Sequence, residues 1–220
     1  MSIDEVVGWA THGRPLPERR VLITFDDGYA DLAEFAFPAL RDAGLSAVVF
    51  IVTGRLGGTS NWDERIGGGG HRLLEAEAIA AWSRRGIEFG AHTRTHPHLT
   101  AVSASQLERE VAGSRGDLEA VVGEPVRSFA YPWGEMDAHV QAAVSAHFAI
   151  AFDCIGRINA RGADPHRLER VMVLPTDGDL DIAMRVSLGF SPRQRAKARV
   201  ARAVGRVRRR RQLAAARTQS

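Results

Sequence analysis

The sequence has little cysteine and no long hydrophobic run. Cys154 is the only cysteine among 220 residues, so the chain can form no internal disulfide and its folding needs no oxidising compartment. Nowhere do 18 or more apolar residues follow one another, which argues against a membrane-spanning helix. The first twenty residues lack the apolar core of a secretory signal peptide. From these absences we expect a cytoplasmic location.

Acidic residues are missing from the C-terminal thirty positions. Residues 191–220 hold eleven lysines and arginines, while the rest of the chain holds 18 basic and 26 acidic residues. We therefore predict a domain at 1–190 and an Arg-rich basic tail at 191–220, helical or disordered. Such a tail could contact an anionic membrane surface. The alternatives are a solvated segment and a nucleic-acid contact, which would be steeply salt-dependent.

The two glycine motifs that cradle nucleotide phosphates, GxGxxG after the first strand and GxxxxGK[ST], are also absent. Instead, short apolar runs alternate with amphipathic stretches. This pattern predicts strands at 20–25, 45–53, 87–93, 126–132, 149–154 and 170–176, and helices at 29–44, 73–86, 103–123, 137–148 and 179–188. The glycine-rich stretch 54–72 is predicted to be a loop, with a flexible linker at Gly67–Gly70.

Regular alternation of this kind predicts an α/β protein with a parallel sheet and helices outside it. At least five such units favour a (β/α) barrel, complete or incomplete. A doubly wound open sheet is the alternative.

Polar side chains follow three of the predicted strands. Asp26 and Asp27 follow the first strand, the segment 92–98 with its three histidines follows the third, and the segment 131–134 follows the fourth. In both α/β architectures the active groups gather where strands end and loops begin. We therefore expect these residues to converge at one rim of the sheet.

The spacing of His92 and His96 indicates a metal site. On one helical turn they would share a face and could grip one ion, although Pro97 would interrupt such a helix. Two histidines and one aspartate leave a position for water, which is typical of a catalytic metal site. A bound divalent ion would lower the pKa of its water, and a second aspartate kept off the ion could accept the proton. His98 is expected to be a structural or surface residue.

These residues resemble the polysaccharide deacetylase family, carbohydrate esterase family 4, with its NodB-homology domain. The first family motif, TFDDG, is present as Thr24–Gly28, and the second, H-[ST]-x-x-H, as His92–His96. The third, F-R-x-P-[YF]-G, is matched by FAYPWG at Phe129–Gly134. The motifs occur in the family's order, and the resemblance covers about residues 15–180.

The resemblance implies a distorted (β/α) barrel of about seven parallel strands with the active site at the C-terminal rim. It implies a hydrolase that removes the N-acetyl group, in some members an O-acetyl group, from a sugar and releases acetate. By motif position, Asp27, His92 and His96 would bind the metal. Zinc is the first expectation, with cobalt or another divalent ion as alternatives. Asp26 would be the general base.

The third motif implies further roles. The backbone N–H of Trp133 would help to stabilise the oxyanion of the tetrahedral intermediate. The side chains of Tyr131 and Trp133, with Pro132 between them, would wall the sugar site. The alternative for these side chains is packing at the barrel rim.

The chain departs from the family pattern at two places. Ala130 stands where the third motif carries an arginine that orients the catalytic aspartate. Arg170 and Arg94 are the candidates to replace it, and we predict that Arg170 pairs with Asp26 as part of the catalytic set. The last family motif, L-x-H, supplies a histidine that protonates the leaving amine. No such motif is found here, and Asp177 is the candidate to take its place.

The substrate is expected to be an N-acetylated glycan, glycolipid, lipid-linked sugar or sugar intermediate. Because no signal peptide or carbohydrate-binding module is recognised, a small or lipid-linked intracellular substrate is favoured over a cell-wall polymer. The missing arginine and histidine leave an alternative of another class. In that alternative, a catalytically weak barrel keeps the metal site and binds a glycan or regulates a partner.

Overall fold

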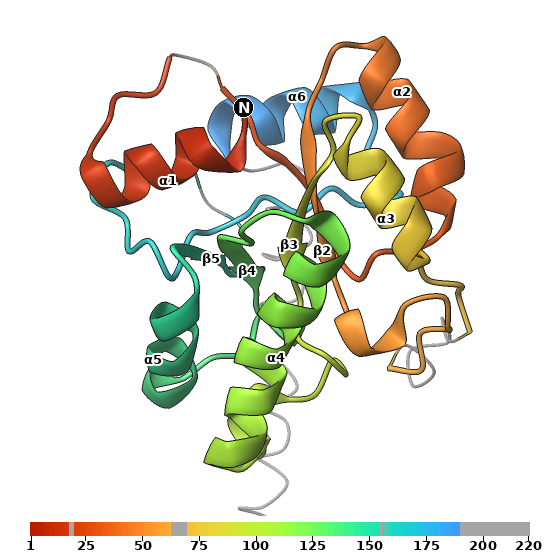
Figure 1. Ribbon diagram of the computed structural model, residues 1–220. Coiled ribbons are helices and arrows are strands. Elements are labelled where there is room, and N and C mark those ends of the chain that lie inside the picture. The colour runs from red at the N-terminus through yellow and green to blue at the C-terminus, as the bar shows by residue number, and fades with distance from the viewer. Residues whose placement is uncertain (18–19, 63–69, 155, 157, 190–220) are drawn as a thin grey trace, which may run out of the picture. The chain divides into compact units, whose positions relative to one another are not determined.

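The computed structural model describes residues 1–17, 20–62, 70–154, 156 and 158–189 (Figure 1). The chain divides into two compact units. The first comprises Met1–Ile155 and Asn159–Arg170, and the second comprises Gly156–Ile158 and Val171–Ser220. The predicted basic tail and the residues 67–69 of the predicted glycine linker lie outside the described residues. Each unit is described by itself below.

A five-stranded parallel sheet forms the centre of the first unit. Its strands are β1 (Ile23–Phe25), β2 (Ala47–Ile51), β3 (Glu88–Ala91), β4 (Ser128–Ala130) and β5 (Ile150–Phe152). They are hydrogen-bonded in the order of the sequence, and every pair is parallel. A doubly wound sheet reverses its strand order at a switch point. The sequential order therefore excludes that alternative and confirms the predicted α/β fold of a distorted (β/α) barrel.

Within the part of the chain that the structure describes, the sheet has five strands, fewer than the predicted number of about seven. Within the described residues, the segment 170–176 forms no strand. The chain pairs with β5 earlier, at Leu168, through a parallel bridge to Phe152. Met172 and Val173 are exposed, so they lack the burial that the apolar run in this segment had indicated. The prediction of a sixth strand at 170–176 is therefore wrong.

Helices occupy the segments between the strands, one helix precedes the first strand, and the last helix belongs to the second unit. The helices are α1 (Ile3–His12), α2 (Phe37–Asp42), α3 (Ala76–Ser83), α4 (Ala104–Val122), α5 (Ala138–His147) and α6 (Asp179–Leu188), with short helical turns at Leu32–Ala36, Thr53–Arg55, Leu99–Ala101 and Pro132–Gly134. The turn at Leu32–Ala36 is π-helical and leads into α2. Pro38 at the start of α2 lacks the N–H that would bond to the carbonyl four residues earlier, which accounts for the wider turn before it.

Alternate residues of β2 belong to two hydrophobic clusters. Val49 and Ile51 pack in the larger cluster with residues of α2, α3, α4 and α5, whereas Val48 and Phe50 pack in a smaller cluster with α1. Period-two alternation places successive side chains of a strand on opposite faces. Both faces of the sheet are thus covered, which agrees with the continuous apolar sequence of this strand.

The N-terminal helix α1 was not among the predicted elements. Ser2 and Glu5 form a capping box at its start, and Gly13 ends it in the left-handed conformation. Its apolar residues Ile3, Val6 and Val7 are buried in the smaller cluster. This segment was tested only for a signal peptide, whose apolar core it lacks, and its capping box and apolar spacing were the signals of a helix.

The long helix α4 agrees closely with its prediction. Ser103 caps the first turn by accepting a hydrogen bond from the Gln106 N–H, and Gly123 ends the helix with φ of 76°. In the second unit, α6 agrees with its predicted range and ends at Gly189. Among the helices of the described residues, none combines the length and the apolar character that crossing a membrane would require.

Candidate active site

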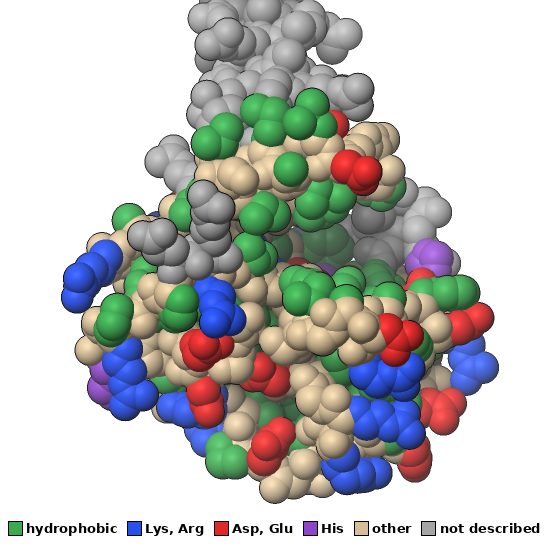
Figure 2. All heavy atoms as spheres, turned by 90° about the horizontal axis from the view of Figure 1, so that it is seen from above, with side chains coloured by type: hydrophobic (Ala, Val, Ile, Leu, Met, Phe, Trp, Pro, Cys, Tyr) green, Lys and Arg blue, Asp and Glu red, His purple; other side chains and the backbone are tan. Residues whose placement is uncertain are grey.

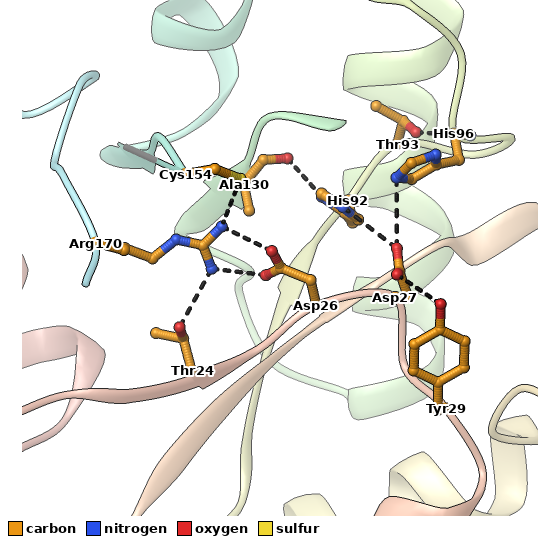
Figure 3. Close-up of polar contacts among 10 residues, drawn as sticks. All are labelled: Thr24, Asp26, Asp27, Tyr29, His92, Thr93, His96, Ala130, Cys154 and Arg170. Atoms are coloured by element: carbon orange, nitrogen blue, oxygen red, sulfur yellow. Dashed lines mark hydrogen bonds and ion pairs between the residues drawn. The ribbon is translucent and has the colours of Figure 1, made fainter. Parts of the chain in front are cut away.

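The two adjacent aspartates after β1 point to different partners. Asp27 has φ of 69°, a left-handed conformation that is uncommon outside glycine, and Gly28 follows with φ of 77°. The Gly28 N–H donates to Asp26 O at 2.9 Å, which closes the tight turn. Figure 3 shows the result: the Asp26 carboxylate faces Arg170, and the Asp27 carboxylate faces His92 and His96.

The two histidines lie on a loop and not on a helical turn. The His92 N–H donates to Ile51 O at 2.9 Å and extends the pairing of β3 with β2 by one residue. Thr93 and His96 both have positive φ, 67° and 59°. The His96 N–H donates to Thr93 Oγ1 at 3.0 Å. The prediction that one helical turn aligns the histidines is therefore wrong, because a loop with two left-handed residues brings them together.

A buried carboxylate on α4 holds this histidine loop. Glu110 Oε2 accepts hydrogen bonds from the backbone N–H groups of Arg94 and Thr95 at 2.8 and 2.9 Å, and Glu110 Oε1 accepts one from Thr95 Oγ1 at 2.6 Å. On the other side, the Gly54 N–H donates to Arg94 O at 2.8 Å. A Cβ at Gly54 would lie only 2.6 Å from that oxygen, so the close approach requires glycine.

The imidazole of His92 has a defined tautomer. Its Nδ1 lies 2.7 Å from Ala130 O, and a carbonyl oxygen only accepts, so Nδ1 carries the proton. Its other ring nitrogen, Nε2, faces Asp27 Oδ1 at 3.5 Å. Histidines that bind a metal usually donate a hydrogen bond from their second ring nitrogen in this way. At the position where the family motif has arginine, Ala130 thus contributes its backbone carbonyl.

The described residues contain one group of side chains that could hold a metal ion, and it consists of Asp27, His92 and His96. Their possible ligand atoms all lie within 4.8 Å of one another. Asp27 Oδ1 lies 3.5 Å from His92 Nε2 and 3.4 Å from His96 Nε2. Ligand atoms about 2.0–2.1 Å from one tetrahedral ion lie roughly 3.3–3.4 Å apart. The two separations from Asp27 Oδ1 are therefore close to the ligand spacing around a tetrahedral divalent ion.

Burial favours the neutral form of His96 that a metal site needs. Burial, and the neighbouring His92 in second place, lower the pKa of His96 to about 3. The ring stacks on Trp62 with centroids 4.6 Å apart and meets Trp133 edge-on at 4.8 Å. A neutral imidazole held between two indoles keeps its lone pair available for a cation at all pH values near neutral.

Arg170 makes the contact with Asp26 that we predicted. Its Nη1 and Nη2 donate to Asp26 Oδ1 and Oδ2 at 2.6 and 2.8 Å, a bidentate pair. Nη1 also donates to Thr24 Oγ1, and Nε donates to Asp153 O, which fixes the guanidinium plane. The other candidate, Arg94, instead pairs with Asp117 on α4 at 2.8 Å.

The Arg170 pair sets the protonation of Asp26. Burial alone would raise the pKa of this carboxyl group, but the charge and the hydrogen bonds of Arg170, together with the neighbouring His92 and His96, outweigh it. The pKa of Asp26 therefore lies below its ordinary value, and the group is ionised at neutral pH. Such a carboxylate, about 30% exposed, can accept a proton from a molecule bound at the rim.

Of the three third-motif residues that were predicted to contact the sugar, only Trp133 is exposed. Its exposed fraction is 38%, and it stacks on His98 with centroids 5.2 Å apart. Tyr131 is fully buried and donates its hydroxyl to His166 O, and Pro132 is buried as well. The predictions that Tyr131 and Pro132 wall the sugar site are therefore wrong, because their side chains belong to the interior.

A family model described as polysaccharide deacetylase matches residues 13–150. The chain belongs to the polysaccharide deacetylase family. A curated relative, YxkH of Bacillus subtilis, whose name assigns it to the same family, is 26% identical over 166 residues. The match covers 75% of this chain and 55% of the relative, so the chain spans about half the length of that protein.

Solved structures share the fold of this polysaccharide deacetylase family member. The deacetylase PplD of Streptococcus pyogenes, solved with acetate, is 20% identical with a TM-score of 0.72, covering 87% of this chain and 79% of its own. IcaB of Ammonifex degensii is 22% identical with a TM-score of 0.69, covering 80% of this chain and 76% of its own. At these identities the likeness establishes the distorted (β/α) barrel.

Sequence analysis missed two residues that shape the site of this family member. Glu110 lies on the buried stripe of α4 with Leu107, Val111 and Leu118, and a charged residue on such a stripe is the signal that could have found it. Trp62 lies in the stretch that was predicted to be a loop, and no pattern in the sequence indicated its stacking on His96.

Asp177 does not have the environment of an acid catalyst. Its oxygens lie 2.8 and 2.9 Å from Nε and Nη2 of Arg185, and it also accepts the Leu174 N–H. All of these residues belong to the second unit. Asp177 is thus engaged in a bidentate pair with a buried arginine of its own unit.

Proposed function

We propose that this protein is a metal-dependent deacetylase that hydrolyses the N-acetyl group of an amino sugar in a glycan, glycolipid or sugar intermediate and releases acetate. The observation that carries the proposal is the division of the two adjacent carboxylates. Asp27 faces two histidines, and Asp26 faces an arginine. Membership of the polysaccharide deacetylase family supports the same conclusion. An O-acetyl group is the alternative substrate of the same site.

Asp27, His92 and His96 would hold the cofactor, a divalent ion. Two imidazole nitrogens and one carboxylate oxygen suit zinc first, and cobalt or another divalent ion second. When bound, such an ion supplies Lewis acidity and lowers the pKa of a water molecule. The chain itself contributes fixed ligand orientations, since His92 is held by Ala130 O and the loop of His96 by Glu110.

Asp26 would act as general base and take a proton from the attacking water. Arg170 would keep this carboxylate ionised and aimed at the rim. The backbone N–H of Trp133 would donate to the oxyanion that develops on the acetyl oxygen. The side chain of Trp133 would present its indole to the sugar ring. The C–N bond would then break as the proton held by Asp26 passes to the leaving nitrogen, and acetate and the free amine would be the products.

A glycan-binding or regulatory barrel without turnover is the other function that the sequence allowed. One of its two motives was the missing motif arginine. Arg170, from a different point of the chain, forms an ion pair with Asp26. This contact favours the hypothesis that the protein is an enzyme. A pure binder would gain nothing from an ionised base held beside a metal site.

Acetate release from an N-acetylglucosamine oligomer tests the proposed function. We expect turnover with Zn²⁺ or Co²⁺ and loss of turnover after a chelator removes the ion, with recovery on re-addition. Acetate is measured by a coupled enzymatic assay, with an O-acetylated sugar in parallel to separate the two bond types. Metal-dependent binding of the oligomer without acetate release would contradict the proposal and establish the glycan-binding alternative.

We further propose that an anionic membrane surface is a partner of the second unit. The exposed residues of α6 include Leu180, Ile182, Val186 and Leu188, and Figure 2 shows hydrophobic side chains gathered along this helix. The eleven basic residues of 191–220 follow it directly in the sequence. An apolar helix surface followed in the sequence by many basic residues is a composition typical of interfacial membrane binding. A lipid-linked sugar would suit such a location.

Deletion of residues 191–220 is expected to abolish binding to vesicles that contain phosphatidylglycerol. Each basic residue near an anionic surface contributes about 1 kcal/mol, so the loss of eleven outweighs the apolar contacts. Cosedimentation with these vesicles measures the effect, and vesicles of phosphatidylcholine alone are the control. Equal binding of the full chain and the deletion variant would refute the membrane contact.

A further inference from the structure

The hydroxyl of Tyr29 donates a hydrogen bond to the aspartate of the candidate metal site. Tyr29 Oη lies 2.9 Å from Asp27 Oδ2 (Figure 3). The other oxygen of the same carboxylate, Oδ1, is the one that lies 3.5 and 3.4 Å from the Nε2 atoms of His92 and His96. Asp27 Oδ2 thus lies against Tyr29, and Asp27 Oδ1 lies against the two histidines.

The position of Tyr29 is fixed by contacts that do not involve the metal site. Its backbone forms an antiparallel bridge with Leu73. The neighbouring Ala30 N–H donates to Arg72 O at 2.8 Å. The ring meets His71 edge-on, with centroids 5.7 Å apart and planes at 76°. The hydroxyl is therefore held by the stretch 71–73, from a different part of the chain than the ligands.

Carboxylate orientation is the property that this contact controls. The χ2 torsion of aspartate is broad, so an unsupported Asp27 would sample many orientations of its two oxygens. A hydrogen bond from a fixed donor selects one orientation before the ion arrives, and it reduces the entropy that binding would otherwise cost. Outer partners of ligating carboxylates and histidines typically change metal affinity by about 10- to 100-fold.

We propose that Tyr29 is a positioning residue of the metal site, which sets Asp27 to offer Oδ1 to a divalent ion and raises the affinity of the site for it. This inference rests on the proposed function, because it assumes that Asp27, His92 and His96 hold the ion. No family motif quoted above includes Tyr29, which directly follows the glycine of TFDDG.

Zinc affinity of three variants tests the proposal. Tyr29→Phe removes only the hydroxyl. Tyr131→Phe is the matched control, since it also removes a tyrosine hydroxyl that donates a 2.9 Å hydrogen bond, there to His166 O. His96→Ala reports on the metal site itself. The Kd for Zn²⁺ is measured by competition with a chromophoric chelator, alongside the Co²⁺ absorption spectrum and the thermal midpoint of the metal-free proteins.

We expect Tyr29→Phe to weaken Zn²⁺ binding by about 10- to 100-fold and to change the Co²⁺ spectrum. Tyr131→Phe should keep the wild-type Kd and spectrum, even where its thermal midpoint falls. Wild-type affinity in Tyr29→Phe, together with lost binding in His96→Ala, would overturn the role of Tyr29 and leave the metal site standing. Equal binding by wild type and His96→Ala would overturn the metal site and, with it, the inference.

Discussion

Asp26→Asn is expected to lower kcat for acetate release by about 10²–10⁴-fold, the range that a positioned general base contributes. Asparagine has nearly the same shape and still accepts a hydrogen bond from Arg170 through its carbonyl oxygen. It cannot accept a proton at neutral pH. Because Asp27, His92 and His96 are unchanged, Zn²⁺ binding should persist. The variant therefore separates proton transfer from metal binding, which the substitution of Asp27 would not do.

The control for this change is Asp42→Asn, which also removes an acid paired with arginine. Asp42 lies 2.8 Å from Arg41 on the surface of α2, away from the β1 turn. Its kcat should equal that of the wild type. If Asp26→Asn retained wild-type turnover with Zn²⁺ bound, Asp26 would not be the base, and the division of the two carboxylates would have another explanation.

The position of the site could be predicted because strand ends carry strong signals. Buried strands are short apolar runs, and the residues that follow parallel strands meet at one edge. Asp26, Asp27 and the histidine segment were therefore expected at one rim, and the structure brings them together. The fold class followed from the same alternation of strands and helices.

The local geometry of the histidine segment could not be predicted in this way. The i, i+4 spacing indicated a helical turn, but the loop depends on positive φ at Thr93 and His96 and on hydrogen bonds that its backbone N–H groups donate to Glu110. Those hydrogen bonds join residues about fifteen positions apart. Periodicity reports on which side chains are buried, and it carries no information on which buried acceptor a loop amide will find.

The sequence offered two candidates for the arginine that the third motif lacks, and Arg170 was predicted to be the one that pairs with Asp26. Arg94 is nearer in sequence to the motifs, yet it points to Asp117 on α4. Arg170 follows β5, whose end lies at the same edge of the sheet as the end of β1, and its guanidinium reaches Asp26. A charge required at one point in space can thus come from a different point in the chain.

The two aromatic residues of the third motif were assigned one common role, and the local backbone explains why this assignment failed for Tyr131. Tyr131 and Trp133 are two residues apart and were both expected to face the sugar. Trp133 has φ of 63° within a tight turn, whereas Tyr131 continues β4 and donates its N–H to Phe152 O. The turn separates the environments of the two side chains, and only Trp133 reaches the surface.

Arg170→Met is expected to lower kcat/KM by about 10²-fold at neutral pH, the scale of a misplaced catalytic group. Methionine keeps the packing near Phe50 and Phe152 but removes both hydrogen bonds to Asp26. Breaking a buried ion pair costs up to about 3–5 kcal/mol of stability, and less here because about 30% of the Asp26 side chain is exposed. A fall in thermal midpoint should therefore accompany the loss of activity.

The pH dependence of the variant follows from the direction of the Asp26 shift. In the wild type the pKa of Asp26 is lowered, so its contribution to stability is present above the ordinary aspartate pKa and is lost as the pH falls through the lower folded value. Without Arg170, burial acts unopposed by that charge and the pKa of Asp26 rises. The acid limb of the kcat/KM profile should then move to higher pH, and the stability difference from wild type should shrink as the pH falls.

Two further variants make this result specific to the Asp26 contact. Arg170→Lys keeps the charge but loses the bidentate geometry, so it should restore the acid limb towards the wild-type pH while regaining only part of the rate. Arg167→Met removes an arginine that is 61% exposed and lies 3.7 Å from Asp153, and it should leave the profile unchanged. Wild-type turnover and an unshifted acid limb in Arg170→Met would show that other groups hold Asp26 ionised, and the ion pair would then serve stability alone.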